Sequence, residues 1–569
     1  MEDSTRSLES REKEGTQFRI NLHNNHGKGG FLSSFLILGT SLGLNIASGA
    51  WYSNLIVFLI SVFNVKNIPA TQINNIFSGF INFFPIIAAI LADSSFGAFA
   101  VTLVSSLISL LGVLMFTLMV TIRSLRPPKC DSNSSMSCIP PTTLQYSILY
   151  ISLTLASLGL GGTRFILGTM GADQFDKPKQ QASFFNWFVF ILYIGWIIGY
   201  TLLIYIQTSV SWALSFAIAL AANTIAVVLF LLGSRIYRKF PPQGSPFTSI
   251  ARVFVASLKN VKRVMPENRQ DCYLYESEDS KLTYGEPSTS LRFLNKAALI
   301  KEGANSKTKS WSQCTVEEVE DLKKLLKLMP LWSSSILLSG VIGVIISFTV
   351  LMALVMDRYV GSHFKIPAGT FVVVTLISTA ITSSILDRFI YPTYKKLTGR
   401  NLTYLQCIGL GHVSNILAAV AFALIERKRL NLVELHGLTK QSNGEEVAPF
   451  SALWLVIPLV VMGIGEGFYF APEVALYYQE YPKSLRSTST AMISLHIAAG
   501  YYMSSAFIKI VGETSSWLPN DINLGRVDKA CWVLGIVATL NFAYFLVWAM
   551  VYKYNDHELD LGDDSFASN

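Results

Sequence analysis

Long apolar stretches, separated by short polar ones, run along almost the whole chain. A helix that crosses a lipid bilayer needs about 20 mostly apolar residues. Stretches of that length lie at about 31–63, 69–94, 98–122, 143–170, 183–207 and 211–234, and after a long polar segment at about 329–356, 367–391, 403–425, 449–473, 487–511 and 530–553. The pattern predicts an all-α membrane protein with 12 transmembrane helices in two six-helix bundles.

The polar segments set the expected domains and topology. We expect a tail at 1–28, a six-helix bundle at 29–234, a linker at 235–328, a second six-helix bundle at 329–554 and a tail at 555–569. The linker is rich in lysine and arginine, which are more frequent on the cytoplasmic side of a membrane. We therefore expect the linker and both termini in the cytoplasm, and the loops 123–142 and 357–366 on the outer side.

Two local features bear on this topology. Arg427, Lys428 and Arg429 fall in a loop that is expected to face outward, so they run against the charge rule. From Thr315 to Leu328, apolar residues recur at helical spacing, which predicts an amphipathic helix that leads into the seventh span. The linker is then either a tether between the bundles or a site of regulation by partners or phosphorylation.

Composition supports a membrane protein and excludes several other classes. Charged residues make up 14% of the chain, against about 25% in soluble domains, and hydrophobic residues make up 51%. The mean hydropathy is +0.42. These values exclude a disordered chain, a disulfide-stapled scaffold and a nucleic-acid binder. The formal net charge of +8 favours contact with anionic lipid headgroups first and with an anionic substrate second.

The cysteines and histidines predict no metal site. Cys130 and Cys138 share the loop after the third span, where a disulfide and two free thiols are both open. Asn133 between them begins a glycosylation sequon, which is used only if the loop is extracellular. No Cys/His cluster has metal-ligand spacing, and neither a Walker motif nor a catalytic triad is present. We therefore expect no metal, no cofactor and no enzymatic activity.

A short acidic segment occurs at matching places in the two halves. Asp93 to Gly97 follows the second span, and Asp387 to Arg400 follows the eighth. An acidic residue followed by glycine in both places indicates an internal duplication. We expect Asp93 and Asp387 to hold helix ends together and to let each loop act as a hinge, while an ordinary helix cap is the alternative for Asp93. This pattern is similar to the major facilitator superfamily, whose fold is two six-helix bundles around a central cavity.

Ionisable side chains inside spans indicate function, because each costs about 2.5–3.5 kcal/mol or more in a bilayer. Arg164 lies in the fourth span and Glu466 in the tenth. In a two-bundle fold these spans face one another across the cavity, so we expect a pair that gates its inner end; a purely structural ion pair is the alternative. An arginine left without a carboxylate would attract an anion. The glycines before Arg164, such as Gly159, are expected to allow close helix packing.

Three further titratable residues are expected to have ordinary structural roles. Glu473 lies near the cytoplasmic end of the tenth span, where we expect it to be solvated. His412 and His496 are isolated in their spans, and we expect both to be packed or snorkelling side chains and not ligands.

Several motifs together resemble a known family. They are Gly171 to Asp176 (GADQFD), Phe184 to Trp187 (FFNW), Trp311 to Pro330, Met356 to Arg358 and Pro482 to Ser487. They resemble the plant nitrate transporter 1/peptide transporter family, the proton-coupled oligopeptide transporter branch of the major facilitators. The resemblance covers about residues 30–555 and is closest to the nitrate excretion clade. It implies a plant plasma-membrane carrier of nitrate or chloride.

The departures from the family pattern bear on proton coupling. The family's first span carries Glu-x-x-Glu-Arg, tied to proton coupling, whereas Ser41 to Asn45 contains no ionisable group. The family's fourth-span lysine corresponds to Arg164, which keeps the charge but does not give up its proton. The tenth-span glutamate is kept as Glu466, and the fifth-span asparagine corresponds to Tyr193. The resemblance therefore implies weak or absent proton coupling.

These residues define an expected site and function. A peptide needs groups for both of its termini, whereas a small inorganic anion needs one cation and a few hydroxyls or amides. The expected substrate-binding residues are Arg164, Asn45, Tyr52, Tyr193 and Tyr469, and the expected gating or coupling residues are Arg164, Glu466, Asp93 and Asp387. We expect an alternating-access nitrate transporter of low affinity or efflux type. The alternatives are a carrier of organic solutes such as peptides, glucosinolates or hormones, a channel, or a non-transporting sensor or scaffold.

Overall fold

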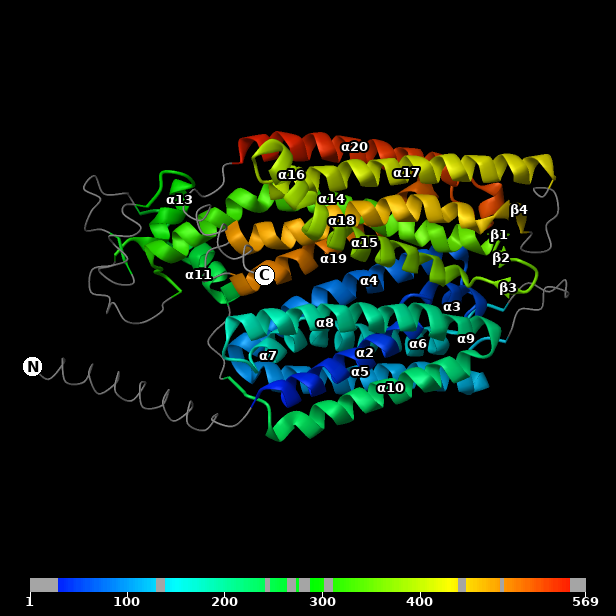
Figure 1. Cartoon of the computed structure of the whole chain (residues 1–569), viewed down its shortest axis with the longest axis horizontal. Coiled ribbons are helices and arrows are strands. Elements are labelled where there is room, and N and C mark those ends of the chain that lie inside the picture. Colours follow the sequence, from blue (N-terminus) through cyan, green and yellow to red (C-terminus); the bar gives the residue numbers. More distant parts are fainter. Residues whose placement is uncertain are drawn as a thin grey trace, which may run out of the picture. The chain divides into compact units, whose positions relative to one another are not determined.

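The computed structural model describes residues 29–128, 139–240, 246–263, 273–275, 287–300, 311–437, 447–480 and 486–552, and this part is mainly helical (Figure 1). Among these residues, 11 helical stretches are long and apolar enough to cross a membrane. One of them, Asn67–Thr121, has 55 residues and contains two helices, α4 (Asn67–Leu91) and α5 (Gly97–Thr121). The stretches therefore comprise the 12 predicted spans, and the all-α membrane fold is confirmed.

The helices follow the predicted order along the chain. The first half contains α2 (Phe31–Tyr52), α3 (Leu55–Ser61), α4, the π-helix η1 (Ala92–Phe96), α5, the 3-10 helix η2 (Arg123–Leu125), α6 (Thr143–Arg164), α7 (Ile166–Ala172), α8 (Pro178–Ile198), the π-helix η3 (Gly199–Leu203), α9 (Ile204–Ser209), α10 (Trp212–Leu232) and the 3-10 helix η4 (Gly233–Arg235). The linker contains α11 (Pro246–Lys259), α13 (Arg292–Asn295) and the 3-10 helix η5 (Lys296–Ala298). The second half contains α14 (Val316–Leu354), η6 (Ala368–Val372), α15 (Val373–Ile385), the π-helix η7 (Leu386–Ile390), α16 (Tyr391–Thr398), α17 (Tyr404–Leu435), η8 (Ala452–Leu455), α18 (Val456–Glu480), α19 (Arg486–Thr514), η10 (Ile522–Leu524) and α20 (Val527–Val551).

Short strands lie beside the ends of two helices in the second half. β1 (Met356–Asp357) follows α14 and pairs in parallel with β4 (Ala448–Ser451), which precedes η8. β2 (Tyr359–Val360) and β3 (Phe364–Lys365) form an antiparallel pair within the predicted outer loop 357–366.

Residue contacts divide the chain into two compact units. Unit 1 comprises Met1–Trp51, Leu91–Ile122 and Ser147–Gln243, and unit 2 comprises Tyr52–Ile90, Arg123–Tyr146 and Gly244–Asn569. The second span therefore groups with the second half of the chain in its contacts, and the predicted boundaries at 29–234 and 329–554 stay a prediction.

Close helix packing in unit 1 depends on glycines. Gly159 of α6 faces α5, where an added Cβ would lie 2.4 Å from the Cα of Ser109. Gly49 of α2 faces the start of η3, where an added Cβ would lie 2.5 Å from the Cα of Gly199. Real Cβ atoms do not approach other atoms this closely, so only glycine allows these helix pairs to touch. The predicted packing role of Gly159 is confirmed.

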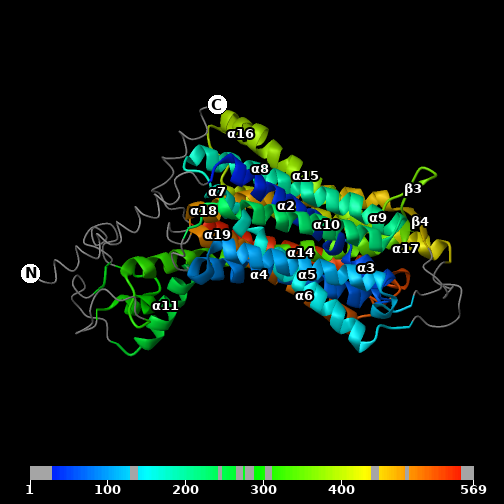
Figure 2. The ribbon, with the colours of Figure 1, turned by 90° about the horizontal axis from the view of Figure 1, so that it is seen from below.

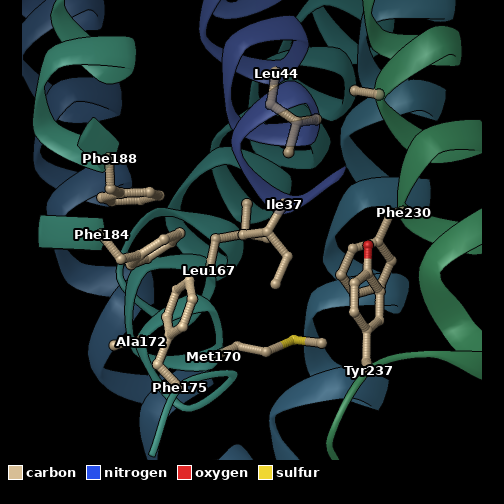
Figure 3. Packing of buried hydrophobic residues seen from close by; sticks show 11 residues of the cluster. Ile37, Leu44, Leu167, Met170, Ala172, Phe175, Phe184, Phe188, Phe230 and Tyr237 are labelled. Carbon is tan, nitrogen blue, oxygen red and sulfur yellow. The ribbon is translucent and has the colours of Figure 1, made fainter. Parts of the chain in front are cut away.

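A buried aromatic cluster joins two motifs of unit 1. Phe175, from GADQFD, and Phe184, from FFNW, lie with ring centres 6.3 Å apart, and Phe188 continues the stack along α8 (Figure 3). Gly171 lies against the same ring, since an added Cβ would come within 2.0 Å of the Phe184 Cζ. The two motifs are therefore parts of one packing contact, in which a glycine makes room for an aromatic ring.

The predicted linker contains a folded element. A helix is present over the predicted segment, and it is continuous with the seventh span in α14. A capping box between Thr315 and Glu318 begins the helix. The buried face of its first turns carries Val316, Val319 and Leu322, and Arg252 of α11 forms an ion pair with Glu318. These contacts hold α11 against α14, which favours a defined linker structure.

The prediction of a basic outer loop was wrong. Arg427, Lys428 and Arg429 lie inside α17, which continues to Leu435. Arg429 is fully buried, and its guanidinium donates to both carboxylate oxygens of Glu426 at 2.7 and 2.8 Å. One of the three positive charges is thus neutralised within its own helix. The predictions for Cys130, Cys138 and Asn133 concern residues outside the described ranges.

Candidate functional site

Arg164 lies at a break in the fourth span. It is the last residue of α6, and α7 begins at Ile166 after the single connecting residue Phe165. The guanidinium carbon lies 5.1 Å from the ring centre of Trp196 on α8 and 5.7 Å from that of Phe165. Contacts of this kind contribute about 0.5–2 kcal/mol each, and the carbonyl end of a helix also favours a positive charge. The local fold therefore stabilises a half-buried cation at this position.

Two more predicted residues of unit 1, Tyr193 and Asn45, are connected to Arg164 by contacts along α8. The Tyr193 ring packs edge-on against Trp196 with ring centres 6.0 Å apart. Asn45 of α2 contacts α8 at Gly195, where an added Cβ would lie 2.8 Å from the Asn45 Cβ. The Asn45 amide group donates to the Ser41 carbonyl at 2.7 Å. Unit 1 therefore brings Arg164, Tyr193 and Asn45 to one region of α2, α6 and α8.

Sequence reasoning missed Trp196, the residue that connects this group. It lies three residues after Tyr193, so both rings point to neighbouring positions of α8. The signal was an aromatic pair at helical spacing in the same span as the predicted Tyr193. Such pairs are common in membrane helices, and because neither residue is charged, the sequence did not distinguish this pair from the others.

A cavity of about 550 Å³ opens between α2 and α8 in unit 1. Its lining is mostly apolar and includes Phe31, Ser34, Phe35, Leu38, Gly39, Leu42, Phe175, Gln180, Ser183, Phe184, Trp187 and Ile191. On α2 the lining ends at Leu42, three residues before Asn45, and on α8 it ends at Ile191, two residues before Tyr193. The cavity therefore lies between the N-terminal parts of α2 and α8, which run side by side in Figure 2.

Glu466 lies on α18 in unit 2. Its side chain is buried, and its Oε2 accepts a hydrogen bond from the Thr379 hydroxyl of α15 at 3.0 Å. Glycines flank it on the same helix, and an added Cβ at Gly463 would lie 2.5 Å from the Ser378 Cβ, so α18 and α15 are closely packed. Arg164 belongs to unit 1 and Glu466 to unit 2, and their pairing stays a prediction. Tyr52, the last residue of α2, is half-buried and also groups with unit 2.

Tyr469 is fully buried in unit 2, and its hydroxyl lies 3.0 Å from Nε2 of His496 on α19. Because this hydroxyl already has a partner inside the bundle, its surroundings favour a role in a buried network over contact with a substrate. His496 is therefore hydrogen-bonded and not merely packed. His412 is packed as predicted, since its ring stacks on Phe545 with centres 4.7 Å apart.

The prediction that Glu473 is solvated was wrong. Its side chain is 1% exposed, and its Oε1 accepts hydrogen bonds from the Ser335 hydroxyl at 2.7 Å and from the Tyr477 hydroxyl at 3.0 Å. Its Oε2 lies 3.5 Å from Nε2 of His496. The missed signal was a polar stripe, because Glu466, Tyr469, Glu473 and Tyr477 recur at helical spacing along one face of α18.

The two predicted hinge acids occupy equivalent local structures. Asp93 is the second residue of η1, which joins α4 to α5, and Asp387 is the second residue of η7, which joins α15 to α16. Both elements are π-helices of five residues. The Asp93 side chain is half-buried, and that of Asp387 lies outside the described part of the structure. Their matching backbones support the predicted duplication, and their role as hinges stays a prediction.

Comparison with known proteins agrees with this fold. Residues 99–524 match the model of the POT family. Two Arabidopsis thaliana relatives, Protein NRT1/PTR FAMILY 2.3 and Protein NRT1/PTR FAMILY 2.4, are 45% and 44% identical to the chain, covering 94% and 95% of it and 96% and 97% of their own lengths. The fold is similar to that of an auto-inhibited POT family peptide transporter of known crystal structure, with a TM-score of 0.68 and 17% identity over 92% of this chain and 98% of that one.

The family match covers most of the chain, and the Arabidopsis relatives align over nearly their full lengths. The family consists of transporters, so the chain is a multi-pass membrane transporter and not an enzyme. These sequence and fold similarities together show that the chain belongs to the POT family, in its NRT1/PTR branch.

Proposed function

We propose that this transporter moves nitrate, or chloride as a second small anion, across the plasma membrane by alternating access, with both termini in the cytoplasm. The single observation that carries the proposal is the Arg164 guanidinium, held half-buried over the ring of Trp196 at the break between α6 and α7. A guanidinium matches planar oxyanions such as nitrate, and an aromatic support fixes its plane. Tyr193 and Asn45 supply neighbouring polar groups for the same anion.

The chemistry of the first span supports efflux without obligatory proton symport. Helix α2 contains no acidic or basic residue over its whole length, so it offers no carboxylate that could accept a proton. An anion leaving a cell that is negative inside gains about 2.3 kcal/mol per 100 mV. This energy corresponds to a concentration ratio of about 50-fold, which is enough to drive export without a second gradient. We assign the gating of this cycle to Arg164, Glu466 and the hinge residues Asp93 and Asp387.

The test is nitrate flux in liposomes that contain the purified transporter, with membrane voltage and pH imposed independently. We expect Arg164→Ala to lower nitrate flux at least about 100-fold, because loss of a buried ionic contact of about 3 kcal/mol corresponds to that factor. Arg164→Lys keeps the charge and should retain partial flux. Lys509→Ala is the matched control, because Lys509 is an exposed cation in another span. Undiminished flux in Arg164→Ala, with the protein present in the membrane, would overturn the assignment of the anion site.

The cavity between α2 and α8 favours a second candidate function. Its volume of about 550 Å³ lies within the range of pockets for drug-sized molecules, and its lining is largely aromatic and aliphatic. A small inorganic anion needs neither that volume nor that lining. A carrier of organic anions would use Arg164 for the carboxylate or sulfate group and the cavity for the apolar part. Counterflow of labelled nitrate against unlabelled nitrate, and of labelled organic acids against the same unlabelled acids, separates the two candidates, since a nitrate carrier exchanges nitrate and not the organic acid, whereas an organic-anion carrier exchanges the organic acid.

A further inference from the structure

A second polar site lies within unit 2, apart from Arg164, Tyr193 and Asn45, to which the proposed function assigns the anion. We name it the acid–imidazole cluster, and it consists of Glu473 and Tyr469 on α18 and His496 on α19. All three side chains are at most 1% exposed. Helices α14, α18 and α19 run alongside one another around it (Figure 1). The predicted anion chemistry of unit 1 makes no use of this cluster.

The hydrogen bonds around Glu473 leave a place for one shared proton. The Ser335 and Tyr477 hydroxyls both donate to its Oε1, whereas its Oε2 has no hydrogen-bond partner among the described residues and lies 3.5 Å from His496 Nε2. An ionised carboxylate buried without a positive partner is strongly unfavourable. A carboxylate beside an imidazolium and a carboxylic acid beside a neutral imidazole are both uncharged overall. The pair is therefore stable when it holds one proton and unstable when that proton is lost.

Within the described part of the chain, no other charged group neutralises the Glu473 carboxylate. No lysine or arginine there forms an ion pair with Glu473. The titratable groups that face the cluster are His412 of α17, whose ring centre lies 6.4 Å from that of Tyr469, and Glu466 and Tyr477 of α18. Helix α14 contributes hydroxyl groups, and α20 contributes the apolar rings beside His412. His496 is thus the basic group within reach of the carboxylate.

Tyr469 connects this pair to the rest of the helix. Its hydroxyl lies 3.0 Å from the same His496 Nε2 that faces Glu473. Glu466, Tyr469 and Glu473 follow one another at intervals of three and four residues, so they lie on one face of α18, with the two carboxyl groups about 10 Å apart along the axis. The phenol stands between the two acids, where it can pass a proton by accepting one and giving up its own.

Pro472 gives this arrangement a mechanical consequence. It lies inside α18, directly before Glu473, and a proline removes a backbone hydrogen bond and favours a bend. Bending α18 at this point changes the separation of Glu473 from His496, because His496 lies on another helix. The bend of α18 then changes how tightly Glu473 and His496 hold their proton. By the same linkage, loss of the proton changes which bend of α18 is favoured.

We propose that Glu473 and His496 bind one exchangeable proton, which Tyr469 relays along α18 towards Glu466, and that this site sets the pH dependence of transport. In the exchange the Glu473 Oε2–H bond breaks and the lone pair of His496 Nε2 accepts the proton, so that the total charge is unchanged. The regulatory consequence rests on the proposed transport function, while the proton site rests on the cluster alone. The site supplies pH sensitivity that α2, which has no carboxylate, does not supply.

The first measurement is independent of transport. Infrared difference spectra of the purified full-length protein between acidic and alkaline pH report carboxyl and imidazole groups that change protonation. We expect a signal in the wild type that disappears in both Glu473→Gln and His496→Gln. Each partner alone stays neutral when buried, so neither titrates without the other. Glu513→Gln is the matched control, an exposed acid on the same helix as His496, and it should keep the signal. If one partner still titrates after removal of the other, no proton is shared and the proposal is wrong.

The second measurement is nitrate flux at fixed voltage over a range of pH. We expect wild-type flux to change by up to about tenfold per pH unit on one side of the midpoint, as binding of a single proton requires, and to lose this dependence in both variants. Flux with an unaltered pH profile in Glu473→Gln overturns the proposal. If no anion is transported but the infrared signal behaves as expected, the proposed function fails and the proton site stands.

A third variant keeps the test decisive if the single variants do not fold. Tyr469→Phe retains the ring and removes only the hydroxyl that contacts His496. We expect the midpoint of the infrared titration to shift, because the imidazole loses a hydrogen-bond partner. An unchanged midpoint in a monodisperse Tyr469→Phe protein overturns the assignment of Tyr469 and of the shared proton.

Discussion

Replacing Arg429 by methionine should strongly destabilise unit 2. Arg429 and Glu426 are one turn apart on α17, and both side chains are fully buried. The guanidinium donates to both carboxylate oxygens, and its third contact is the Asn523 side-chain oxygen at 2.5 Å. Arg429→Met removes every positive partner of this carboxylate in the described structure. Breaking one side of a buried ion pair costs about 3–5 kcal/mol, so we expect a loss of that size.

The assay is thermal unfolding of the purified transporter in detergent, followed by the fraction that remains monodisperse. Lys428→Met is the matched control on the neighbouring residue. Lys428 is exposed, and its ammonium lies 4.8 Å from the Trp454 ring centre, a contact worth about 0.5–1 kcal/mol. We expect Arg429→Met to lower the apparent Tm several times more than Lys428→Met does. Equal shifts would refute the reasoning from burial.

A double variant separates the charge from the packing. Glu426→Gln combined with Arg429→Met removes both buried charges, and apolar or neutral replacements of a buried pair are often neutral in stability. We expect the double variant to recover most of the loss caused by Arg429→Met alone. If the double variant is as unstable as the single one, Arg429 stabilises α17 by its bulk and not by neutralising Glu426.

Two smaller effects follow from the ends and contacts of helices. Thr315→Ala removes the capping box of α14 and should lower the stability of this helix end by about 1 kcal/mol, measured as faster amide exchange in the first turn of α14. Thr154→Ala, on an exposed face of α6, is the control and should not alter amide exchange in α14. Gly159→Ala places a Cβ 2.4 Å from the Ser109 backbone and should cost about 1–3 kcal/mol by thermal unfolding, while Gly512→Ala, which meets no atom within 4 Å, should be close to neutral; equal effects of these two variants would contradict the packing argument.

The spans could be predicted from sequence because hydropathy measures what the bilayer requires. Helix ends could not, because a helix continues beyond the apolar core where its backbone hydrogen bonds allow. Helix α17 has 32 residues, or about 48 Å, which is longer than the roughly 30 Å core of a bilayer. Arg427, Lys428 and Arg429 therefore lie in a helix although they follow the apolar stretch. Glu426, three residues before Arg429, was the available signal for a helical ion pair.

The candidate site was predicted from charge and was incomplete where charge gave no guidance. Arg164 and Glu466 stood out as ions within apolar spans, whereas Trp196 is one of many aromatic residues in the chain. Glu473 was predicted to be solvated only because it lies near the end of a predicted span. Its partners Ser335 and His496 lie 138 and 23 residues away in sequence, so only the packing of α14, α18 and α19 brings them together.

Two of the three π-helices in the described part of the chain, η1 and η7, support a common origin of the two halves, whereas the third, η3, lies within the fifth span and contains no aspartate. Fewer than about 1% of residues in proteins lie in π-helices, which occur mainly at functional positions. Both η1 and η7 carry an aspartate at their second residue, and each begins the connection after an even-numbered span, the second and the eighth. The match of position and of the acid, which η3 does not share, is what favours a duplication over an independent origin. Since a π-helix widens one turn and weakens its hydrogen bonds, Asp93 and Asp387 lie where a helix connection bends at low cost, which favours hinges over ordinary caps.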